Sequence, residues 1–562
     1  MERFINILII DPDPKTRNGL KEILSGGGNN TLVSEDVEKA VPVIQKKSVG
    51  IILISLSEIN QDLTTFDLLR KQNKEKNCYI LLISKESITA PTLVKGMNKG
   101  AVDYIQYPFN PNLIRSKIEV YKSLYYKDQR IGQLLENIFP HNVLEELSTT
   151  GKYSPKRVQN GVVLFTDFVD FSSKAKDTKP LHLIRQLEKH FTRFDEIIRK
   201  YNLEKIKTIG DAYMALSGVT ENKPLPATRA CLAALEIREY LRTERDIAIA
   251  MNKDFWEIRI GIHMGPLVAG IIGSSKYSFD VWGDSVNIAS RAESATRRGS
   301  ITVTAPIVEE IETFFEIRSR GQIEIHKRGG SVEMYYLERL KPENCLYGEG
   351  KYANAELRLQ CGLSSMDFDH LRKEILNRLK SLLPEDILYH DIPHTLNVEK
   401  AAVRYAQLEG LSQEEILILR TAVLFHDSGF TRQYEHNEDF GAQIAEKILP
   451  GYGYSREQIE QIISIIRATR SDVEPQTLIE MIMCDADHDY LGRADYRSIA
   501  NKLRKEMANF GTVFTDTEWI KYQLNFLVNQ HHYYTETARN IREQGKNHRI
   551  SDLQRELENI KD

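Results

Sequence analysis

The sequence predicts a multidomain protein that begins with an α/β fold and ends with an all-α fold. Over about the first 125 residues, short apolar runs alternate with amphipathic stretches, a pattern typical of a doubly wound parallel sheet. From residue 366 onward, apolar residues recur at helical spacing in one segment after another. The chain has 562 residues, and at roughly 150 residues per domain this length leaves room for a further domain between the two.

The composition argues against a disordered or strongly charged chain. Hydrophobic residues make up 41% of it and the net charge is −4, so we expect no general attraction to nucleic acid or to an anionic membrane. No apolar stretch reaches the roughly 20 residues of a membrane span. Five scattered cysteines fit neither a disulfide framework nor a zinc motif, which favours the reducing cytoplasm.

The N-terminal apolar runs at 6–10, 50–56 and 78–84 are expected to form buried parallel strands. The first run leads into IIDPDP, and GAVDYIQYPF stands near the end of the pattern. With this order of elements, the segment 1–125 resembles a response-regulator receiver domain, which has a flavodoxin-like fold.

By the same resemblance, the phosphorylation chemistry of a receiver is incomplete here. The phosphorylated aspartate of the family corresponds to Ser55, and its lysine corresponds to Tyr107. Pro12 stands where a second magnesium-binding acid is expected, beside Asp11. We therefore expect a pseudo-receiver that transmits a signal or dimerises without phosphorylation. A flavodoxin-like domain with no signalling role is the alternative.

Two connecting segments are predicted. Residues 126–157 are rich in helix formers with apolar residues three and four apart, which indicates a helical or coiled-coil linker. The run LLENIFPHNVLEEL resembles the transducer that precedes many nucleotide cyclase domains, and a plain helix broken at Pro140 is the alternative. Residues 341–365, with scattered glycines and polar residues, are expected to form a second linker.

Two aspartates in the middle of the chain each follow a strand-like run. The run GVVLFTDFVDF at 161–171 delivers Asp167, and KIKTIGDAYMA at 205–215 places Asp211 in a tight hairpin. Carboxylate oxygens are the ligands that Mg²⁺ prefers, and two ions roughly 3.5–4 Å apart can activate an attacking oxygen and neutralise a leaving one. Aspartates are common at strand ends, so these two residues alone do not define a site.

Two further blocks give these aspartates a context. They read RIGIHMGPLVAG at 259–270 and FDVWGDSVNIASR at 279–291. With the two aspartate blocks, in this order and spacing, the segment 158–340 resembles the catalytic domain of class III nucleotide cyclases. The resemblance implies an α+β fold of the ferredoxin-like kind and activity as a wrapped head-to-tail homodimer with two equivalent sites.

The resemblance also assigns roles to individual residues. Asp167 and Asp211 are implied to hold two Mg²⁺ or Mn²⁺ ions per site, and the backbone from Phe168 to Phe171 to lie near the phosphates. The other roles are a phosphate-binding arginine, a pair that reads the purine edge, and a pair that holds the ribose and stabilises the transition state. They fall on Arg259, on Lys207 with Asp280, and on Asn287 with Arg291, respectively.

The pair Lys207 and Asp280 favours ATP over GTP. Adenine offers an amine donor at position 6 and a ring-nitrogen acceptor beside it, which suit an aspartate and a lysine. Guanine presents the reverse pattern, and a mismatched buried polar pair discriminates by roughly 10⁴-fold. We therefore expect an adenylate cyclase, in which the ribose 3′-oxygen attacks the α-phosphorus and pyrophosphate leaves. A guanylate cyclase is the alternative.

One loop departs from the family pattern. The family usually ends in a VKGKG-like loop whose lysine holds the terminal phosphates, whereas this chain reads IEIHKRGG. His326 falls on the lysine position, and a shift of one residue would restore the cation through Lys327. Without that shift, triphosphate binding would be weaker, so a catalytically weak nucleotide-binding signalling protein is a second alternative.

A histidine–aspartate set stands out in the helical segment 366–562. The motifs are YHDIPHT with His394, AVLFHDSGF with His426 and Asp427, and CDADHDYLG with Asp485. Imidazole and carboxylate ligands suit a divalent transition metal, which lowers the pKa of bound water. This order resembles the HD superfamily of metal-dependent phosphohydrolases, which implies that these four residues are the metal ligands.

Hydrolysis by this helical segment is one of two interpretations, the other being a metal or nucleotide sensor without turnover. His390 and His436 are candidates for a role beside the ligands or toward a phosphate, whereas His531 and His532 are expected at the surface. The whole sequence thus predicts a cytoplasmic adenylate cyclase that binds ATP. It is expected to receive input from an upstream signalling protein and to contact neither nucleic acid nor membrane.

Overall fold

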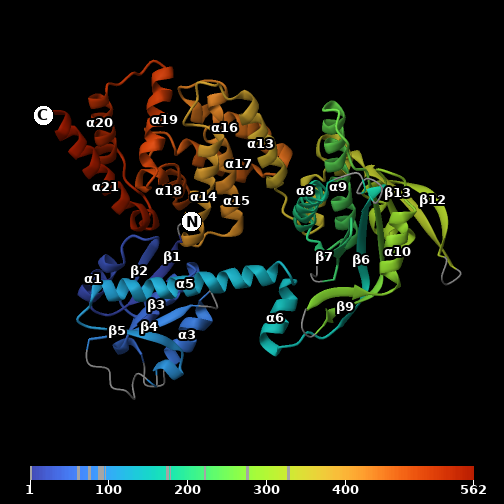
Figure 1. The fold of residues 1–562 in the computed structure, drawn as a ribbon, viewed down its shortest axis with the longest axis horizontal. Coiled ribbons are helices and arrows are strands. Elements are labelled where there is room, and N and C mark those ends of the chain that lie inside the picture. The colour runs from blue at the N-terminus through green and yellow to red at the C-terminus, as the bar shows by residue number, and fades with distance from the viewer. Residues whose placement is uncertain are drawn as a thin grey trace. The chain divides into compact units, whose positions relative to one another are not determined.

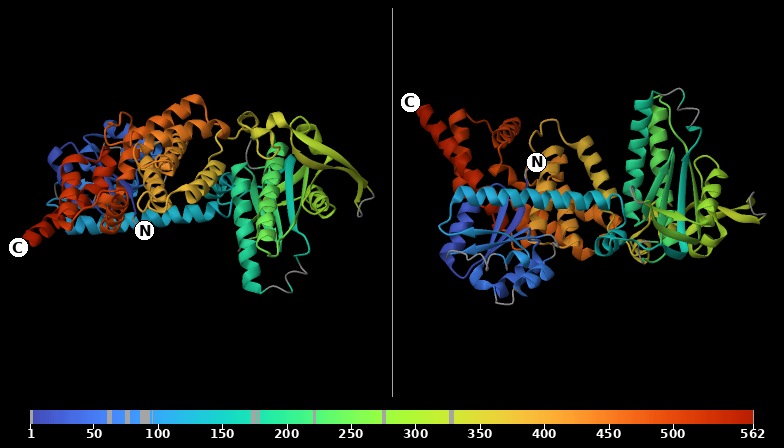
Figure 2. Two further views of the ribbon diagram at one scale, coloured as in Figure 1. Left: turned by 90° about the horizontal axis from the view of Figure 1, so that it is seen from above. Right: turned by 60° about the horizontal axis from the view of Figure 1, so that its bottom comes forward.

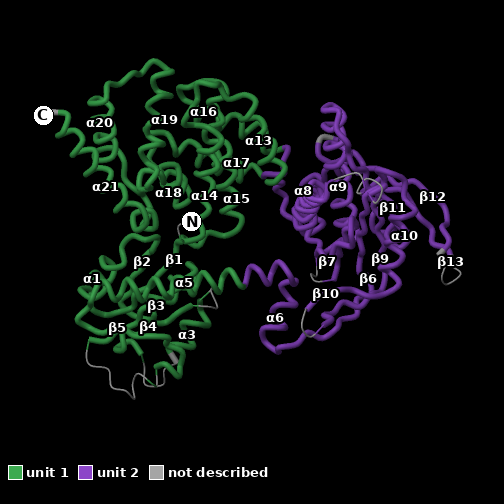
Figure 3. Tube along the Cα trace, viewed as in Figure 1, with its two compact units in different colours: residues 1–131, 368–450, 455–562 green, residues 132–367, 451–454 purple. Residues whose placement is uncertain are grey.

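The computed structural model describes residues 3–59, 64–73, 78–85, 94, 96–171, 176, 179–219, 223–273, 277–325 and 330–561. The chain divides into two compact units, which are treated separately below (Figure 3). The first unit contains residues 1–131, 368–450 and 455–562, and the second contains residues 132–367 and 451–454. Segments from both ends of the chain therefore share the first unit.

The N-terminal part of the first unit is a five-stranded parallel sheet of order β2-β1-β3-β4-β5 (Figure 1). The strands are β1 (Ile5–Ile10), β2 (Asn29–Ser34), β3 (Ile51–Ser55), β4 (Tyr79–Ser84) and β5 (Ala101–Gln106). Its helices are α1 (Pro14–Leu24), α2 (Val37–Lys46), α3 (Thr64–Gln72) and α5 (Pro111–Glu136). This strand order is the flavodoxin-like one, so the predicted α/β fold is confirmed.

Both faces of this sheet are covered, which explains its continuous apolar strands. Leu8 and Ile10 of β1 pack in one core with residues of α2 and α3, whereas Ile7 and Ile9 pack in another core with residues of α1 and α5. Alternate residues of one strand thus serve opposite faces.

The C-terminal part of the first unit is helical, as predicted. Its helices are α13 (Phe368–Leu382), α14 (Ile392–Glu409), α15 (Gln413–Phe425), α16 (Asn437–Ile448), α17 (Arg456–Arg467), α18 (Leu478–Asp487), α19 (Tyr496–Asn509), α20 (Asp516–Asn525) and α21 (Glu536–Lys561). Short turns follow three of them, η4 (Ser428–Thr431), η6 (Asp489–Gly492) and the π-turn η7 (Phe526–Gln530). Four helices begin with a capping box, in which a Ser or Thr side chain and a Glu or Gln three residues later satisfy each other's backbone: α15, α17, α18 and α20.

One expectation about this helical part is wrong. His532 is exposed, but His531 is only 8% exposed. After the π-turn η7, the His531 ring packs 4.7 Å from the ring of Tyr533 and 5.1 Å from that of His488. A histidine pair in a polar stretch gives no local sign that the chain turns inward at its first member.

The second unit is built on an eight-stranded mixed sheet, which has the order β12-β13-β11-β9-β6-β8-β7, with β10 paired to β9. The strands are β6 (Lys156–Phe168), β7 (Glu204–Ile209), β8 (Ala212–Ser217), β9 (Ile258–Ile272), β10 (Ser278–Trp282), β11 (Ile301–Thr304), β12 (Phe315–Ile325) and β13 (Gly330–Leu340). The helices are α6 (His141–Thr150), α8 (Pro180–Lys200), α9 (Pro226–Ala250), α10 (Asp284–Ser294), α11 (Ala305–Ile311) and α12 (Ala355–Gln360). The predicted α+β fold is confirmed.

The central strand β6 shows how this sheet is stabilised. Val162 and Leu164 face the core formed with α8 and α9, whereas Val163 and Phe165 face the core formed with α6 and α10. Figures 1 and 2 show α8 and α9 on one face of the sheet and α10 on the other. The apolar run that precedes Asp167 is therefore buried on both faces, which fixes where the strand delivers its aspartate.

The segment predicted as a linker at 341–365 packs onto this second unit. Cys345, Leu357 and Leu363 belong to the same hydrophobic core as β6 and β9. Two residues beyond the segment, Asp367 lies 2.9 Å from the buried Lys200 ammonium, which also lies 2.8 Å from Glu236. A buried ammonium is costly unless it is paired, so this cluster holds the segment in place.

Across the part of the chain that the structure describes, no helix combines the length and the apolar character needed to cross a membrane.

Candidate active sites

At the carboxyl end of the N-terminal sheet, the Lys85 ammonium lies beside the carboxylates of Asp11 and Asp13. The Nζ atom of Lys85 is 2.7 Å from Oδ2 of Asp13 and 3.7 Å from Oδ1 of the buried Asp11. The hydrogen bond from Lys85 lowers the pKa of Asp13 to about 2. Ser55, in the position of the phosphorylated aspartate, has its Oγ 2.9 Å from that of Ser57. Lys85, which sequence reasoning did not use, thus pairs with Asp13 and approaches Asp11, the acid that by resemblance would hold magnesium in a receiver.

In the second unit, the two predicted metal-binding aspartates come together. Asp167 is the penultimate residue of β6, and Asp211 lies in the turn between β7 and β8, which pair with each other beside β6. Burial, and next the negative charge of Asp167, raise the pKa of Asp211 to about 6, while a backbone hydrogen bond from Phe168 opposes the shift. A carboxylate whose ionisation is disfavoured by a neighbouring carboxylate marks a site of negative potential that suits a cation.

An arginine and a glutamate complete the surroundings of Asp167. Arg259 lies opposite Asp167 in the β6–β9 pairing, with its Nη2 atom 2.7 Å from Asp167 Oδ2 and its Nε atom 3.0 Å from Glu293 Oε1. Burial, and next the charge of Asp167, raise the pKa of Glu293 to about 7. Sequence reasoning missed Glu293. Its signal was an acid on the face of α10 that otherwise carries the small buried residues Ala289 and Ala292.

Close packing of α10 against β9 places this glutamate. A Cβ atom at Gly261 would lie 2.1 Å from the backbone nitrogen of Glu293 and 2.6 Å from the carbonyl oxygen of Ala289. Only glycine fits there, so the glycine of the RIGIH block lets the helix approach the strand.

The predicted base-reading pair also comes together. Lys207 of β7 donates to Asp280 of β10 at 2.5 Å, and the backbone N–H of Val281 donates to the same aspartate at 2.9 Å. The side chains are 39% and 18% exposed, so both can still reach a ligand.

The remaining predicted residues of this segment are placed differently. Asn287 is exposed and Arg291 half-buried on α10, and neither side chain makes a hydrogen bond or ion pair with another described residue. The rings of Phe168 and Phe171 pack 5.0 and 5.5 Å from that of Trp256, which leaves only their backbone for a phosphate. Lys327 lies outside the described residues.

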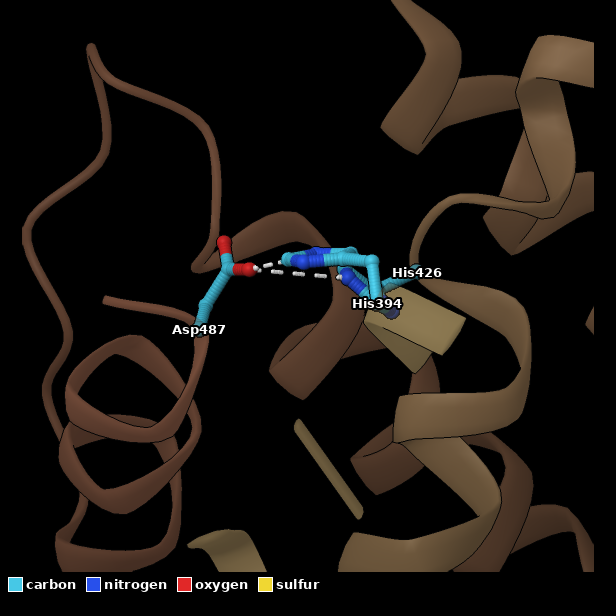
Figure 4. Close-up of side chains that lie close together, drawn as sticks. All are labelled: His394, His426 and Asp487. Atoms are coloured by element: carbon cyan, nitrogen blue, oxygen red, sulfur yellow. Dashed lines mark ion pairs between the residues drawn. The ribbon is translucent and has the colours of Figure 1, made fainter. Parts of the chain in front are cut away.

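A second cluster lies inside the helical part of the first unit. His394 stands in the first turn of α14, His426 follows α15, and Asp487 ends α18. One ligand atom from each lies within 4.8 Å of the others, and Figure 4 shows the three side chains pointing toward one another. The Nε2 atoms of His394 and His426 are 3.1 and 3.7 Å from Oδ1 of Asp487. Asp427 joins them, with its Oδ2 atom 3.3 and 3.0 Å from the same two nitrogens.

Several of these buried nitrogen and oxygen atoms lack hydrogen-bond partners, which is the state expected of metal ligands. The Nε2 atoms of both histidines and Oδ2 of Asp427 are buried without a hydrogen-bond partner. Nδ1 of His426 lies 2.8 Å from the carbonyl oxygen of Val423, which leaves its Nε2 lone pair facing the cluster. Although burial opposes the shift, Asp427 and Asp487 raise the pKa of His394 to about 9. Two imidazoles and two carboxylates around one point are a donor set for a divalent transition metal.

The assignment of Asp485 to this ligand set is wrong. Asp485 accepts hydrogen bonds from the backbone N–H groups of Tyr534 and Thr535 at 2.8 Å and from the Thr535 hydroxyl at 2.7 Å. Both of its oxygens are therefore engaged away from the histidines. Asp487, two residues later in the same run, is the aspartate that faces them.

The two accessory histidines have different surroundings. His390 Nδ1 lies 2.5 Å from Oε1 of the fully buried Glu506, and its ring stacks on that of Phe430 at 4.3 Å. His436 is exposed, with a φ of 55°, immediately before α16. His390 is thus held beside the cluster, whereas His436 faces solvent.

Two hollows adjoin the cluster. One, of about 60 Å³, is lined by His394 and Asp487 and by the cationic side chains of Arg493 and Lys502. The other, of about 190 Å³, reaches Asp487 and His390 and is lined mainly by aromatic rings, among them Tyr389 and Trp519. The two cations of the smaller hollow are paired with acids of the same lining, Arg493 with Asp489 at 3.7 Å and Lys502 with Asp391 at 3.3 Å. The larger hollow offers a bound group an apolar wall.

Three family models match the chain. They are the response regulator receiver domain over residues 7–119, the adenylate and guanylate cyclase catalytic domain over residues 153–339, and the HD domain over residues 391–489.

Curated relatives match the middle segment. An adenylate cyclase of Mycobacterium tuberculosis (strain ATCC 25618 / H37Rv) is 34% identical over 211 residues, which are 37% of this chain and 47% of the relative. Atrial natriuretic peptide receptor 2 of Anguilla japonica is 32% identical over 230 residues, 40% of this chain and 22% of the receptor. The chain thus spans less than half the length of these relatives.

Among solved structures, the guanylate cyclase domain of RhGC from Catenaria anguillulae, in complex with GTP, is similar to part of this chain. It is 28% identical, covers 33% of this chain and 98% of that chain, and has a TM-score of 0.30. Taken in chain order, the three family models thus match a response regulator receiver domain, an adenylate and guanylate cyclase catalytic domain and an HD domain.

Proposed function

We propose that the chain is an adenylate cyclase that converts ATP to 3′,5′-cyclic AMP and pyrophosphate as a homodimer. The observation that carries this proposal is the contact of Lys207 with Asp280 at 2.5 Å, because it presents one donor and one acceptor side by side. The Asp280 carboxylate would accept from the adenine amine, and the Lys207 ammonium would donate to the neighbouring ring nitrogen. Guanine has the reversed edge, so an acceptor of the base would face the Asp280 carboxylate and a donor would face the Lys207 ammonium.

Asp167 and Asp211 would hold the Mg²⁺ or Mn²⁺ ions, which supply positive charge to the attacking and leaving oxygens. Arg259, held between Asp167 and Glu293, would contact the phosphates from the same side. In the reaction, the ribose 3′-oxygen forms a bond to the α-phosphorus, the bond from that phosphorus to the β-phosphate oxygen breaks, and the hydroxyl proton passes to solvent.

The exposed Asn287 and the half-buried Arg291 support a site completed by a second subunit. In this arrangement one subunit offers the two aspartates, and its partner offers the base-reading pair together with Asn287 and Arg291. Because one chain carries both sets, a symmetric dimer has two equivalent sites. The 34% identity to a mycobacterial adenylate cyclase supports the choice of ATP, and an ATP substrate together with five cysteines that form no disulfide supports a cytoplasmic location.

The test compares cyclic nucleotide formation from ATP and from GTP by the full chain. We expect ATP to be preferred, and Lys207→Glu to lower kcat/KM for ATP by about 100-fold or more while the loss with GTP is smaller. Lys205→Ala is the matched control, because Lys205 lies on the same strand and pairs with Asp195 instead. Equal use of GTP, or an unchanged ATP rate in Lys207→Glu, would reject the assignment and favour a guanylate cyclase.

We further propose that the HD domain is a metal-dependent phosphohydrolase. Its support is the set of buried, unpartnered ligand atoms of His394, His426 and Asp427 beside a hollow lined by Arg493 and Lys502. A divalent transition metal held there would activate water. Incubation of the full chain with bis-p-nitrophenyl phosphate and Mn²⁺ should release p-nitrophenol, and His426→Ala should not. Tight Mn²⁺ binding without turnover would leave the metal-sensor alternative.

The receiver domain is proposed to regulate without phosphorylation. Ser55 offers no carboxylate, and Lys85 pairs with Asp13 and approaches Asp11 where magnesium would bind in a receiver. An upstream protein would then act by binding rather than by phosphoryl transfer.

A further inference from the structure

The receiver domain docks inside the first unit on the helical HD part through a buried polar interface. The Asn6 side chain donates to the carbonyl oxygen of Leu408 at 3.1 Å, and that of Asn30 donates to the Thr537 hydroxyl at 3.0 Å. Asn540 in turn donates to Asn30 at 2.8 Å. Asn6, Asn30 and Thr537 are each at most 1% exposed. Buried amides that satisfy one another specify a single docking arrangement.

An ion pair and a close backbone approach extend this interface. Lys47, just after α2, lies 2.7 Å from Glu409 at the end of α14, and Glu409 also accepts from the hydroxyl of Thr537. A Cβ atom at Gly410 would lie 2.0 Å from the carbonyl oxygen of Lys46. The two backbones therefore meet with no room for a side chain, which makes this contact a fitted one.

From the interface, two arginines lead toward the metal cluster. The guanidinium groups of Arg404 and Arg542 lie 4.0 and 5.5 Å from the ring centre of Phe4, the residue before β1. On their other side they meet Asp489, at 2.8 Å from Arg542 and 3.7 Å from Arg404. Asp489 is 3% exposed and also accepts from the Tyr405 hydroxyl at 2.6 Å.

The three aspartates of the DADHD run contact two regions, the histidines of the metal cluster and the residues in and just before α21. Asp487 faces His394 and His426, whereas Asp485 on one side of it binds residues just before α21 and Asp489 on the other side binds Arg542 within α21. The same helix contacts β2 of the receiver domain through Asn540. Asp487 thus lies between two residues with fixed contacts, Asp485 and Asp489. The arginines that bind Asp489 also contact Phe4 of the receiver domain.

We propose that the receiver domain acts in cis on the HD metal site, by holding the Arg404–Arg542–Asp489 anchor that fixes Asp487. This inference rests on the metal site proposed above. Metal–oxygen distances tolerate only about 0.2 Å, so a small shift of the anchor changes metal affinity. A partner that binds the receiver domain, or separates it from the HD part, would then change the metal affinity of the HD site.

The test measures Mn²⁺ affinity of the full chain by electron paramagnetic resonance of the free ion. All proteins carry Asp211→Ala, so that the proposed cyclase metal site is removed from the titration. Phe4→Ala should weaken Mn²⁺ binding by about 10-fold, the lower range for groups that orient metal ligands. Lys47→Gln, on the partly exposed ion pair, provides a milder second disruption in case Phe4→Ala fails to fold. Lys39→Ala is the control, since the Lys39 ammonium pairs, among the described residues, with the exposed Glu35 of its own segment.

A second measurement uses the reciprocity of coupling. Mn²⁺ should slow amide hydrogen exchange in β2 and at the start of α21, and His426→Ala should abolish this effect. Lower thermal stability of Phe4→Ala and Lys47→Gln with unchanged Mn²⁺ affinity would show a merely structural interface and overturn the proposal. Absence of Mn²⁺ binding by the background protein itself would instead reject the metal site on which it rests.

Discussion

The two candidate metal sites differ in how far a single chain completes them. In the HD domain, two imidazole nitrogens and an aspartate oxygen are buried without hydrogen-bond partners and converge on one point. In the cyclase domain, Asp167 is 24% exposed and ion-paired with Arg259, while Asn287 stands exposed. A group buried without a partner implies that something else belongs there, whereas open acids leave room for a ligand to supply the rest. We infer that the HD site can load metal in one chain, and that the cyclase site needs both the triphosphate and a second subunit.

The largest effect is expected from the acids of the cyclase site. Asp211→Ala should lower cyclic AMP formation by about 10³-fold, because the metal-held charge contributes several kcal/mol to the transition state. Asp246→Ala is the matched control, since Asp246 is an exposed aspartate of α9 that pairs with Arg245 and lies outside the proposed site. Rates from purified protein that are equally low for wild type and Asp211→Ala would favour a nucleotide-binding protein without turnover.

In the HD site, whose ligands all come from one chain, loss of a single ligand should lower the metal affinity. His426→Ala should weaken Mn²⁺ affinity by about 100-fold or more, because it removes a ligand rather than an orienting group. His436→Ala, at the exposed position before α16, should bind Mn²⁺ like wild type. Titration of both variants in the Asp211→Ala background measures this difference. Equal affinities would contradict the ligand set.

The smallest expected effect is the activity of mixed dimers, which tests whether the cyclase site, unlike the HD site, needs two chains. Asp211→Ala and Arg291→Ala chains, each inactive alone, should regain about a quarter of wild-type cyclase activity when co-expressed. Half of the dimers are then mixed, and each mixed dimer keeps one of its two sites. Mn²⁺ binding at the HD site should be the same in all of these proteins. If mixing restores no activity, the two sets of residues do not meet across a dimer.

Much of the site chemistry was predictable because it follows local patterns. Asp167 stands at the end of a strand buried on both faces, and Asp211 in a hairpin turn, so their adjacency follows from strand pairing. Lys207 and Asp280 could be paired because their blocks resemble those of class III nucleotide cyclases, which implies that the two residues act together. The assignment of Asp485 failed for a geometric reason. Successive helical residues are about 100° apart, so residues 485 and 487 point in different directions, and only packing decides which one faces the histidines.

The sequence by itself determined the order of the three domains, their fold classes and most ligand types, because these depend on periodicity and on motifs within short segments. Only the tertiary structure decided the contacts between distant segments. They include Glu293 behind Arg259, Lys85 beside Asp13, the packing of residues 341–367 on the cyclase core, and the docking of the receiver domain on α14 and α21. The physical reason is that burial and pairing free energies depend on neighbours in space, which no local pattern encodes.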